Sequence, residues 1–171
     1  MTTRTFDALA LSARLADALA APGQPLPTFQ AADRIAAELL GHRLFTILAF
    51  RAAAGEVERM YSSRPAEYPL LGRKKMGPTP WGDVVLKGGK PWFGACADDI
   101  RWAFPDHELI LSLGCETILN APVRFDGRTL GVISVLDGPG AYGESDLALV
   151  TFMAPHLAAA LLLSDQTLQE I

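Results

Sequence analysis

The chain of 171 residues is half hydrophobic and one-fifth charged, with a formal net charge of −4 at pH 7. This composition supports a folded core and excludes wholesale disorder. The acidic balance argues against nucleic acid as a partner, because phosphate backbones attract basic surfaces. The length fits one domain with extra helices at its ends, since domains usually contain roughly 100–200 residues.

Cysteine usage and the N-terminal segment both indicate a cytoplasmic protein. Cys96 and Cys115 are too few for a disulfide framework and lack metal-ligand spacing, so we expect no metal and no cofactor. Asp7, Arg14 and Asp17 interrupt the apolar N-terminal segment, which argues against a signal peptide. No uninterrupted apolar run reaches the roughly 18 residues that span a bilayer, so we expect no membrane partner.

The first half of the chain predicts two helices followed by two strands. Residues 5–21 form an amphipathic to broadly apolar pattern, and a second helix follows with Thr28 as its N-cap and Gly41 just beyond its last turn. Residues 43–51 are apolar on both alternating faces, which indicates a central strand covered on both sides. Residues 57–63 alternate with polar positions and predict a second strand.

The middle of the chain is irregular. Residues 64–80 are rich in proline and glycine and predict a long loop, and loops of this length in compact domains are often functional. A short helix is expected over residues 81–88, and a brief strand over residues 91–95. Residues 98–113 predict one or two short helices broken at Pro105.

The C-terminal part has the clearest pattern. Residues 115–125 and 129–137 flank Asp126-Gly127, a strong hairpin signal. A helix then begins with Ser145 as its cap, is apolar nearly all round, and should bend at Pro155. The order of elements predicts an α+β fold, with a central antiparallel sheet of five or six strands flanked by N- and C-terminal helices.

Short motifs in this part resemble the end of GAF domains. In that family, a strand with Pro-Val leads through a hairpin to a Gly-Val-Ile strand, and an aromatic residue followed four positions later by Asp opens the last helix. The matching residues here are Pro122-Val123, residues 131–133, and Tyr142 with Asp146. The order of the elements extends the resemblance over roughly residues 25–163. The chain is therefore similar to a short stand-alone GAF protein.

The resemblance implies a sensor domain at residues 25–165, with short helices over a ligand-binding face of the sheet. Residues 1–24 would then be an N-terminal helical segment, and residues 166–171 a tail. GAF domains often dimerise through their terminal helices, and an apolar face on the C-terminal helix invites association. We expect a homodimer through residues 5–21 and 146–163. The alternative is a monomer in which the N-terminal helix covers the same face.

One enzyme of the GAF fold, the free methionine-R-sulfoxide reductase, has a Phe-Pro-x-His stretch that residues 104–107 resemble. When these stretches are matched, Leu71, Trp81 and Ile110 occupy its cysteine positions. Without thiols at these places, the nucleophile and its resolving partner are both missing. We therefore expect no enzymatic activity of this kind.

Several polar residues have two interpretations each. Asn120 lacks the following lysine of cyclic-nucleotide-binding GAF domains, and its amide either lines a pocket or pairs internally. Cys115 precedes Glu116, unlike bilin-attachment cysteines, and is either a small buried hydrophobe or a thiolate partner of His107. His107 is either a ligand or a general base oriented by Asp106, or it lies on the first turn of a helix that Asp106 caps.

A basic and aromatic region within this acidic chain suggests an anion-binding lid. Arg64 and Arg73 lie in the 64–80 loop, with Tyr61 and Trp81 at its ends. Guanidinium groups bind carboxylates or phosphates bidentately, and aromatic faces stack on planar ligands. The alternative is a solvent-exposed loop whose charged side chains serve only to keep it hydrated. The predicted ligand-binding residues are Tyr61, Arg64, Arg73, Trp81, His107 and Asn120.

The preferred function is a regulatory module that binds a small anionic or aromatic metabolite and signals through a partner protein. The ligand would order the 64–80 loop and shift the population of conformations toward the bound state. The rival function is a small enzyme that uses Cys115 with His107 in redox or thiol chemistry. A third possibility is a scaffolding module with a vestigial pocket.

Overall fold

A six-stranded antiparallel sheet organises the protein, whose computed structural model describes residues 4–166. The strand order is β3-β2-β1-β6-β5-β4, and every neighbouring pair is antiparallel, as predicted. The strands are β1 (Leu44–Arg51), β2 (Glu56–Ser62), β3 (Lys74–Lys75), β4 (Trp92–Gly94), β5 (Thr117–Phe125) and β6 (Arg128–Asp137). The expected tail at 166–171 lies, apart from Gln166, outside the described residues, and so do residues 1–3 of the expected N-terminal segment.

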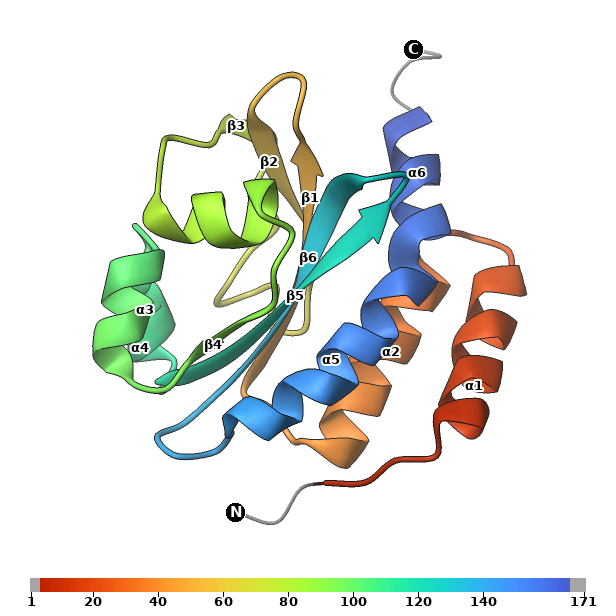
Figure 1. The fold of residues 1–171 in the computed structure, drawn as a ribbon, viewed down its shortest axis with the longest axis horizontal. Coiled ribbons are helices and arrows are strands. Elements are labelled where there is room, and N and C mark those ends of the chain that lie inside the picture. The colour runs from red at the N-terminus through yellow and green to blue at the C-terminus, as the bar shows by residue number, and fades with distance from the viewer. Residues whose placement is uncertain (1–3, 167–171) are drawn as a thin grey trace.

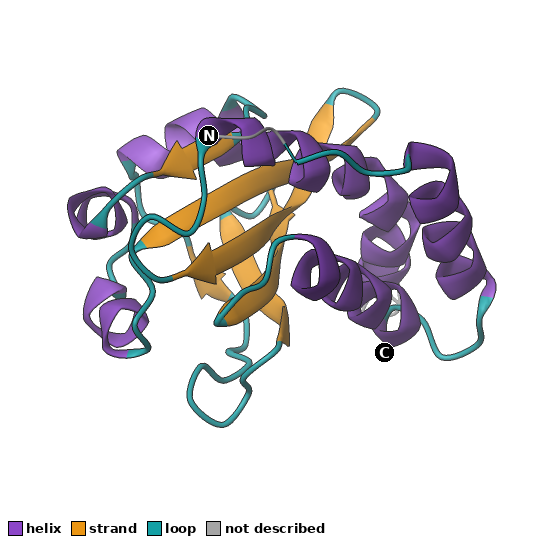
Figure 2. Ribbon diagram, turned by 90° about the horizontal axis from the view of Figure 1, so that it is seen from below, coloured by secondary structure: helices purple, strands orange, loops and turns teal. Residues whose placement is uncertain are grey.

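Helical segments lie on both sides of this sheet, as Figures 1 and 2 show. One side, which we call the helix face, is covered by α2 (Leu26–Leu39), α5 (Leu147–Met153) and α6 (Ala158–Gln166), with α1 (Ala8–Ala20) outside them. The other side, the loop face, is covered by the 64–80 segment, the π-helical η1 (Gly82–Lys87), α3 (Ala97–Ala103) and α4 (His107–Ser112).

The helix ends follow local side-chain chemistry, with one difference from prediction. Asp7 caps α1, and its carboxylate accepts a 3.0 Å hydrogen bond from the Ala10 amide. Helix α2 begins at Leu26, so the predicted Thr28 cap is wrong. The Thr28 hydroxyl is buried inside the first turn and donates to Gln24 Oε1 at 2.7 Å. The helix can begin at Leu26, before Thr28, because a proline fits the first positions of a helix.

The C-terminal elements also match the prediction, apart from the cap. Asp126 and Gly127 both have positive φ and form the expected hairpin turn between β5 and β6. The predicted Ser145 cap is wrong, because a 3₁₀ turn (η2, Glu144–Asp146) precedes α5 and the Asp146 carboxylate accepts from the Gly143 amide at 2.9 Å. A second 3₁₀ turn (η3, Ala154–Leu157) contains Pro155 and interrupts the last helix where a bend was expected.

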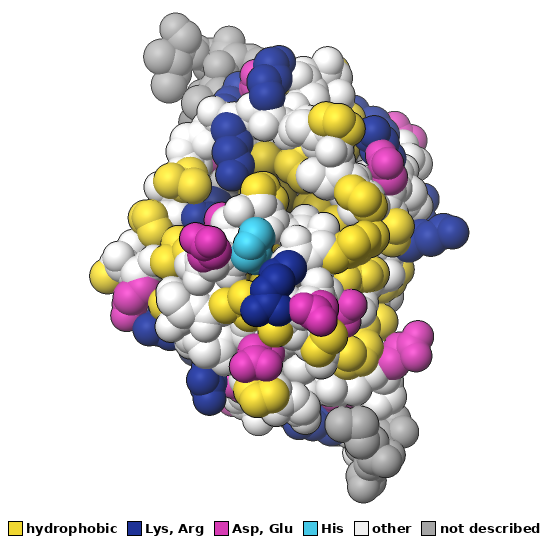
Figure 3. Space-filling model, turned by 90° about the vertical axis from the view of Figure 1, so that its left-hand side faces the viewer, with side chains coloured by type: hydrophobic (Ala, Val, Ile, Leu, Met, Phe, Trp, Pro, Cys, Tyr) yellow, Lys and Arg dark blue, Asp and Glu magenta, His cyan; other side chains and the backbone are white. Residues whose placement is uncertain are grey.

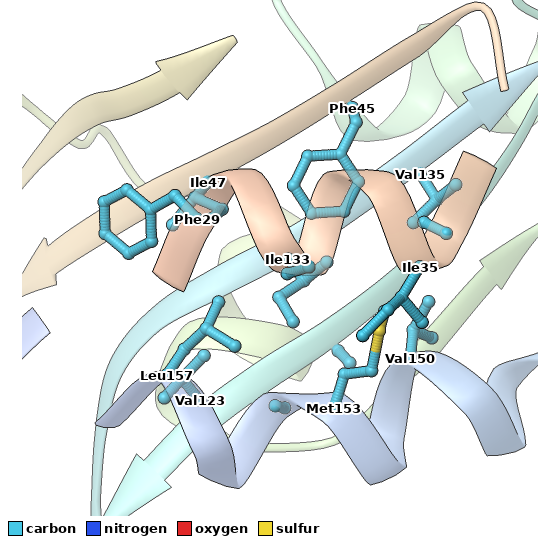
Figure 4. Close-up of a cluster of buried hydrophobic side chains, with 14 of the residues drawn as sticks. Phe29, Ile35, Phe45, Ile47, Val123, Ile133, Val135, Val150, Met153 and Leu157 are labelled. Atoms are coloured by element: carbon cyan, nitrogen blue, oxygen red, sulfur yellow. The ribbon is translucent and has the colours of Figure 1, made fainter. Parts of the chain in front are cut away.

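The main hydrophobic core lies between the helix face and its helices. Figure 4 shows side chains from α2, three strands and the C-terminal helix meeting in one layer. They are fully or almost fully buried: Phe29, Ile35, Phe45, Ile47, Val123, Ile133, Val135, Val150, Met153 and Leu157. Close packing on this side provides the rigid support for the opposite face.

Helix α1 packs on the C-terminal helix within the same chain. Ser12 Oγ and His156 Nε2 form a 3.1 Å hydrogen bond, and the rings of Phe6 and Phe152 lie 5.3 Å apart. Among the described residues, the segment Glu144–Ser164 is long and apolar enough to cross a membrane, with a mean hydropathy of 1.9. Half of its most apolar stretch is buried inside the molecule, which is the behaviour of a core helix.

Candidate functional site

A cavity of about 90 Å³ lies between the loop face and the segments that cover it. We call it the central cavity. Its roof comes from residues 68–76, Trp81 and the junction between α3 and α4. Figure 3 shows this side of the molecule, with a hollow that has hydrophobic side chains at its bottom. The residues of its floor are Leu44, Thr46, Leu48, Val57, Arg59, Ile118, Ser134 and Leu136.

A β-bulge in β2 decides which side chains reach this cavity. Ile47 pairs with Tyr61 and Leu48 with Arg59, so Met60 has no partner in β1. Such an extra residue switches the alternation of a strand from one face to the other. Arg59 therefore points to the loop face. Tyr61 lies instead on the helix face, away from its predicted place on the pocket wall.

The side chain of Tyr61 is engaged on that helix face. Its hydroxyl donates a 2.6 Å hydrogen bond to Asp33 Oδ2, and its ring makes edge contacts with Phe29 and Phe45. Burial, followed by the neighbouring Asp33 carboxylate, raises the pKa of the Tyr61 phenol above its usual value. Tyr61 is thus part of the structural core.

Arg59 is the cation that lines the cavity from the floor of the sheet. Its guanidinium lies 3.6 Å from the centre of the Tyr68 ring, and only 9% of the residue is exposed. One nitrogen donates to the Pro69 carbonyl at 2.6 Å, and another lies 3.4 Å from Asp106 Oδ2. A buried guanidinium with one close and one long contact retains capacity for an additional anionic partner.

Tyr68 connects the 64–80 segment to the same carboxylate. Its hydroxyl donates to Asp106 Oδ2 at 2.8 Å, which places Tyr68, Arg59 and Asp106 in one cluster at the cavity edge. Burial and the Asp106 charge raise the pKa of the Tyr68 phenol above its ordinary value, so the ring stays neutral at physiological pH. This cluster holds the loop over the cavity.

Trp81 lines the roof and is held by a buried amide. Its indole N–H donates to Asn120 Oδ1 at 2.9 Å, and Asn120 Nδ2 donates to Ser134 Oγ at 2.7 Å. Asn120 is fully buried and lies behind the cavity wall, where it positions Trp81 and Ser134. The Asn120 amide therefore pairs internally and does not line the pocket.

The two predicted loop arginines lie outside the central cavity, each beside a carboxylate. Arg64 contacts Glu67 at 3.1 Å three residues further along the loop. Arg73 lies 3.5 Å from Glu58 on β2. These local acidic partners hold both guanidinium groups at the surface. The predicted convergence of Arg64 and Arg73 on one cavity is therefore not what the fold produces.

His107 is the first residue of α4, beside the cavity. Its Nδ1 donates to the Phe104 carbonyl at 2.8 Å, an arrangement that assigns the proton to Nδ1. Asp106 occupies the N-cap position as expected, but its side chain bonds Tyr68 and not the helix amides. The Asp106 carboxylate is thus used to close the cavity, and His107 to shape the turn before α4.

The two thiols differ in their surroundings. Cys115 is fully buried in a hydrophobic cluster with Leu44 and Ile118, and burial, followed by the nearby Asp137 charge, raises its pKa to about 11. Cys96 is exposed at the start of α3. A thiol with so high a pKa is a poor nucleophile near pH 7. Within residues 4–166, no three His, Cys, Asp or Glu side chains are placed to bind a metal ion.

The three positions matched to the cysteines of the sulfoxide reductase all line the central cavity. Leu71 and Trp81 contribute to its roof, and Ile110 approaches from α4. All three side chains are hydrophobic. The matched positions therefore contribute apolar walls to the cavity.

A family model described as GAF domain matches residues 28–162. The chain belongs to the GAF family. Members of this family are typically small-molecule-binding sensor modules. No curated protein matches the sequence. The central cavity lies under the loop and short helices on one face of the sheet, which is where the resemblance predicted a ligand.

Solved GAF structures share the fold at low sequence identity. The GAF domain of a phosphoenolpyruvate-protein phosphotransferase from Coxiella burnetii is 19% identical, with a TM-score of 0.69 over 95% of this chain and 98% of that one. The free methionine-R-sulfoxide reductase of Neisseria meningitidis, in complex with its substrate, is 18% identical, with a TM-score of 0.66 over 98% of each chain. The GAF domain of a sensor histidine kinase from Bacillus halodurans is 13% identical, with a TM-score of 0.67 over 85% and 99%.

Sequence reasoning missed Arg59, Tyr68 and Asp106 as one cluster. A signal for Arg59 was present: it follows Val57 by two positions, so it shares the face of an apolar strand residue. The pairing of Tyr68 with Asp106 joins residues 38 positions apart and has no local pattern. Such contacts depend on the tertiary fold.

Proposed function

We propose that this GAF domain is a sensor for a small metabolite with an apolar body and one anionic group, which binds in the central cavity. Arg59 carries this proposal. It is a buried cation in a mainly hydrophobic cavity, and a carboxylate or phosphate could bind it bidentately. The apolar floor and Trp81 would contact the body of the ligand.

Binding would be coupled to movement of the 64–80 segment. The cavity of about 90 Å³ is smaller than the roughly 300–1,000 Å³ of typical ligand sites, so a metabolite requires the roof to move outward. An anion at Arg59 would compete with Asp106 and with the Pro69 carbonyl, through which Arg59 holds this segment down. Ligand would then shift the population toward a conformation with a rearranged loop.

The proposal also holds that the domain binds its ligand without catalysing a reaction on it. The burial and raised pKa of Cys115 support it, as do the hydrophobic residues Leu71, Trp81 and Ile110 at the matched cysteine positions. The free thiols suit a cytoplasmic sensor. Structures of the same fold include domains of sensor histidine kinases and of a chemotaxis protein, which supports signalling through a protein partner.

A ligand panel tests the binding proposal. We expect hexanoate, benzoate or 3-phenylpropionate to raise the melting temperature, because a ligand at 100 times its Kd adds about 2.7 kcal/mol to stability. Arg59→Gln should abolish the shift caused by hexanoate, which has no aromatic ring. Arg73→Gln, which removes a cation outside the cavity, should retain it. Equal shifts in both variants would exclude Arg59 as the anion partner.

The homodimer through the terminal helices is a second part of the proposal. Leu9 on α1 is 81% exposed and Leu163 on α6 is 44% exposed, and burying such side chains favours association. The packing of α1 on the C-terminal helix within one chain is the competing arrangement. Sedimentation should give about twice 18.3 kDa, and Leu9→Lys should halve that mass. A wild-type mass of one chain at micromolar concentration would overturn the dimer.

A further inference from the structure

A second and larger cleft opens at one end of the sheet. Its volume is about 540 Å³, which is within the range of typical small-ligand sites of roughly 300–1,000 Å³. The β1–β2 hairpin, the β5–β6 hairpin, residues 76–79 and η1 with its following turn surround it. We call it the hairpin cleft. Met76 is the one residue that lines both this cleft and the central cavity.

Two cations of the hairpin cleft have no ion-pair or hydrogen-bond partner for their side chains among the described residues. Arg124 and Arg128 lie on either side of the β5–β6 turn, and neither has an ion pair or side-chain hydrogen bond with any residue in the described part of the chain. Lys87, the third cation, pairs with Asp83 at 2.7 Å. The lining therefore carries an excess of positive charge, although the whole chain has a net charge of −4.

The turn after η1 positions Arg124. Gly89 has φ +60, and a Cβ atom there would lie 2.8 Å from Arg124 Nε. The absence of a side chain at Gly89 lets the arginine approach the turn closely, and both residues line the cleft. This contact restricts the side chain before a ligand arrives, which lowers the entropic cost of binding.

The floor of the hairpin cleft is hydrophobic, with one polar group. Phe50, Met76 and Leu86 provide the apolar surface. A bulge in β6 supplies the polar group: Gly131 pairs with Val123 and Thr129 with Arg124, so the residue between them is unpaired. This shift directs the nearly buried Thr129 toward the cleft.

We propose that the hairpin cleft is a binding site for a small organic anion, in which an aromatic ring lies on Phe50, Met76 and Leu86. Arg124 and Arg128 bind its carboxylate or phosphate group. Guanidinium groups match both oxyanions bidentately, and an aromatic ring suits an apolar floor made by Phe50, Met76 and Leu86. The site is separate from the central cavity and does not depend on Arg59.

Two probes, 1-naphthyl phosphate and 2-naphthoate, test this proposal and distinguish the two oxyanions. Titration into isotope-labelled protein should move the methyl signals of Met76 and Leu86 and the amide of Thr129 in a saturable manner. Neutral 2-naphthalenemethanol should bind at least about tenfold more weakly, since a charged hydrogen bond contributes roughly that factor or more.

Matched variants locate the site. The Arg124→Gln/Arg128→Gln variant should raise the Kd for the better probe at least about tenfold. The control Arg34→Gln/Arg101→Gln has the same change in charge on exposed residues elsewhere, and Arg59→Gln alters only the central cavity; both should retain binding. Circular dichroism and melting temperature should show that all three variants are folded. Unchanged affinity in the Arg124/Arg128 variant, shifts confined to Ile110 and Leu136, or no saturable binding of either probe would overturn the proposal.

Discussion

The two faces of the sheet are built on different principles. The helix face carries a continuous apolar core that includes Phe45, Ile47 and Met153. The loop face divides its hydrophobic residues between two smaller clusters and leaves two hollows, the central cavity and the hairpin cleft. It also buries the polar residues Arg59 and Asn120. Stability is thus concentrated on one side, which leaves the other side free to bind and move.

Adjacent residues of β1 provide the strongest test of this difference. Ile47 is fully buried in the helix-face core, whereas Leu48 borders the central cavity. We expect Ile47→Ala to lower the free energy of unfolding by about 3–5 kcal/mol and Leu48→Ala by about 2 kcal/mol, because Leu48 has fewer packing partners to lose. Urea unfolding measures both. A larger loss at Leu48 would contradict the proposed division of stability.

Alkylation of the two cysteines tests whether the loop face excludes solvent outside the central cavity and the hairpin cleft. At pH 7.5 we expect iodoacetamide to modify Cys96 at least about 100-fold faster than Cys115, because a pKa of about 11 leaves very little thiolate. Below that pKa, the rate at Cys115 should rise about tenfold per pH unit. Cys96→Ser and Cys115→Ser isolate each rate. Rapid modification of Cys115 at neutral pH would revive the thiol enzyme as a candidate.

The buried amide behind the cavity should have a smaller effect. Asn120→Leu leaves the Trp81 indole N–H without its acceptor, at a cost of about 1–3 kcal/mol in stability. In the double variant with Trp81→Phe, that unpaired donor is gone. The double variant should therefore lose about 1 kcal/mol less stability than the sum of the losses in the two single variants. Strict additivity in a double-mutant cycle would mean that the hydrogen bond contributes nothing.

Two tyrosines give the finest comparison, since each donates to one carboxylate. Tyr61→Phe removes the bond to Asp33 on the helix face, and Tyr68→Phe removes the bond to Asp106 on the loop face. Each should cost about 1 kcal/mol of stability. Only Tyr68→Phe should accelerate hydrogen exchange in residues 64–76, because only Tyr68 holds the roof of the central cavity. Equal exchange rates in both variants would show that the hydrogen bond from Tyr68 to Asp106 does not restrain this segment.

The sequence predicted the elements whose signals are local. The Asp126-Gly127 turn, the interruption at Pro155 and the order of strands and helices other than β3, which lies in the expected 64–80 loop, each depend on a few neighbouring residues. The helix caps predicted at Thr28 and Ser145 failed because the Thr28 hydroxyl donates to Gln24, and the Asp146 carboxylate, not Ser145, accepts from the Gly143 amide. Local chemistry therefore predicts that an element exists better than it predicts where the element begins.

The site was harder to predict because its side chains depend on register. Two-residue alternation places Arg59 and Tyr61 on the same face, and the bulge at Met60 separates them. Arg64 and Arg73 have the right chemistry for anions, but Glu67 and Glu58 occupy them. Neither the bulge nor these pairings leaves a periodic pattern in the sequence.

The unpaired Met60 has a consequence for how this protein can evolve. It divides β2 into two half-strands, of which Val57 and Arg59 serve the loop face and Tyr61 serves the core. Mutation of the first half can retune what the cavity accepts while the second half keeps its packing. A shift in register that paired Met60 with Leu48 would instead turn the first half over, placing the guanidinium among hydrophobic rings. Specificity can thus drift residue by residue, whereas the register of this strand cannot.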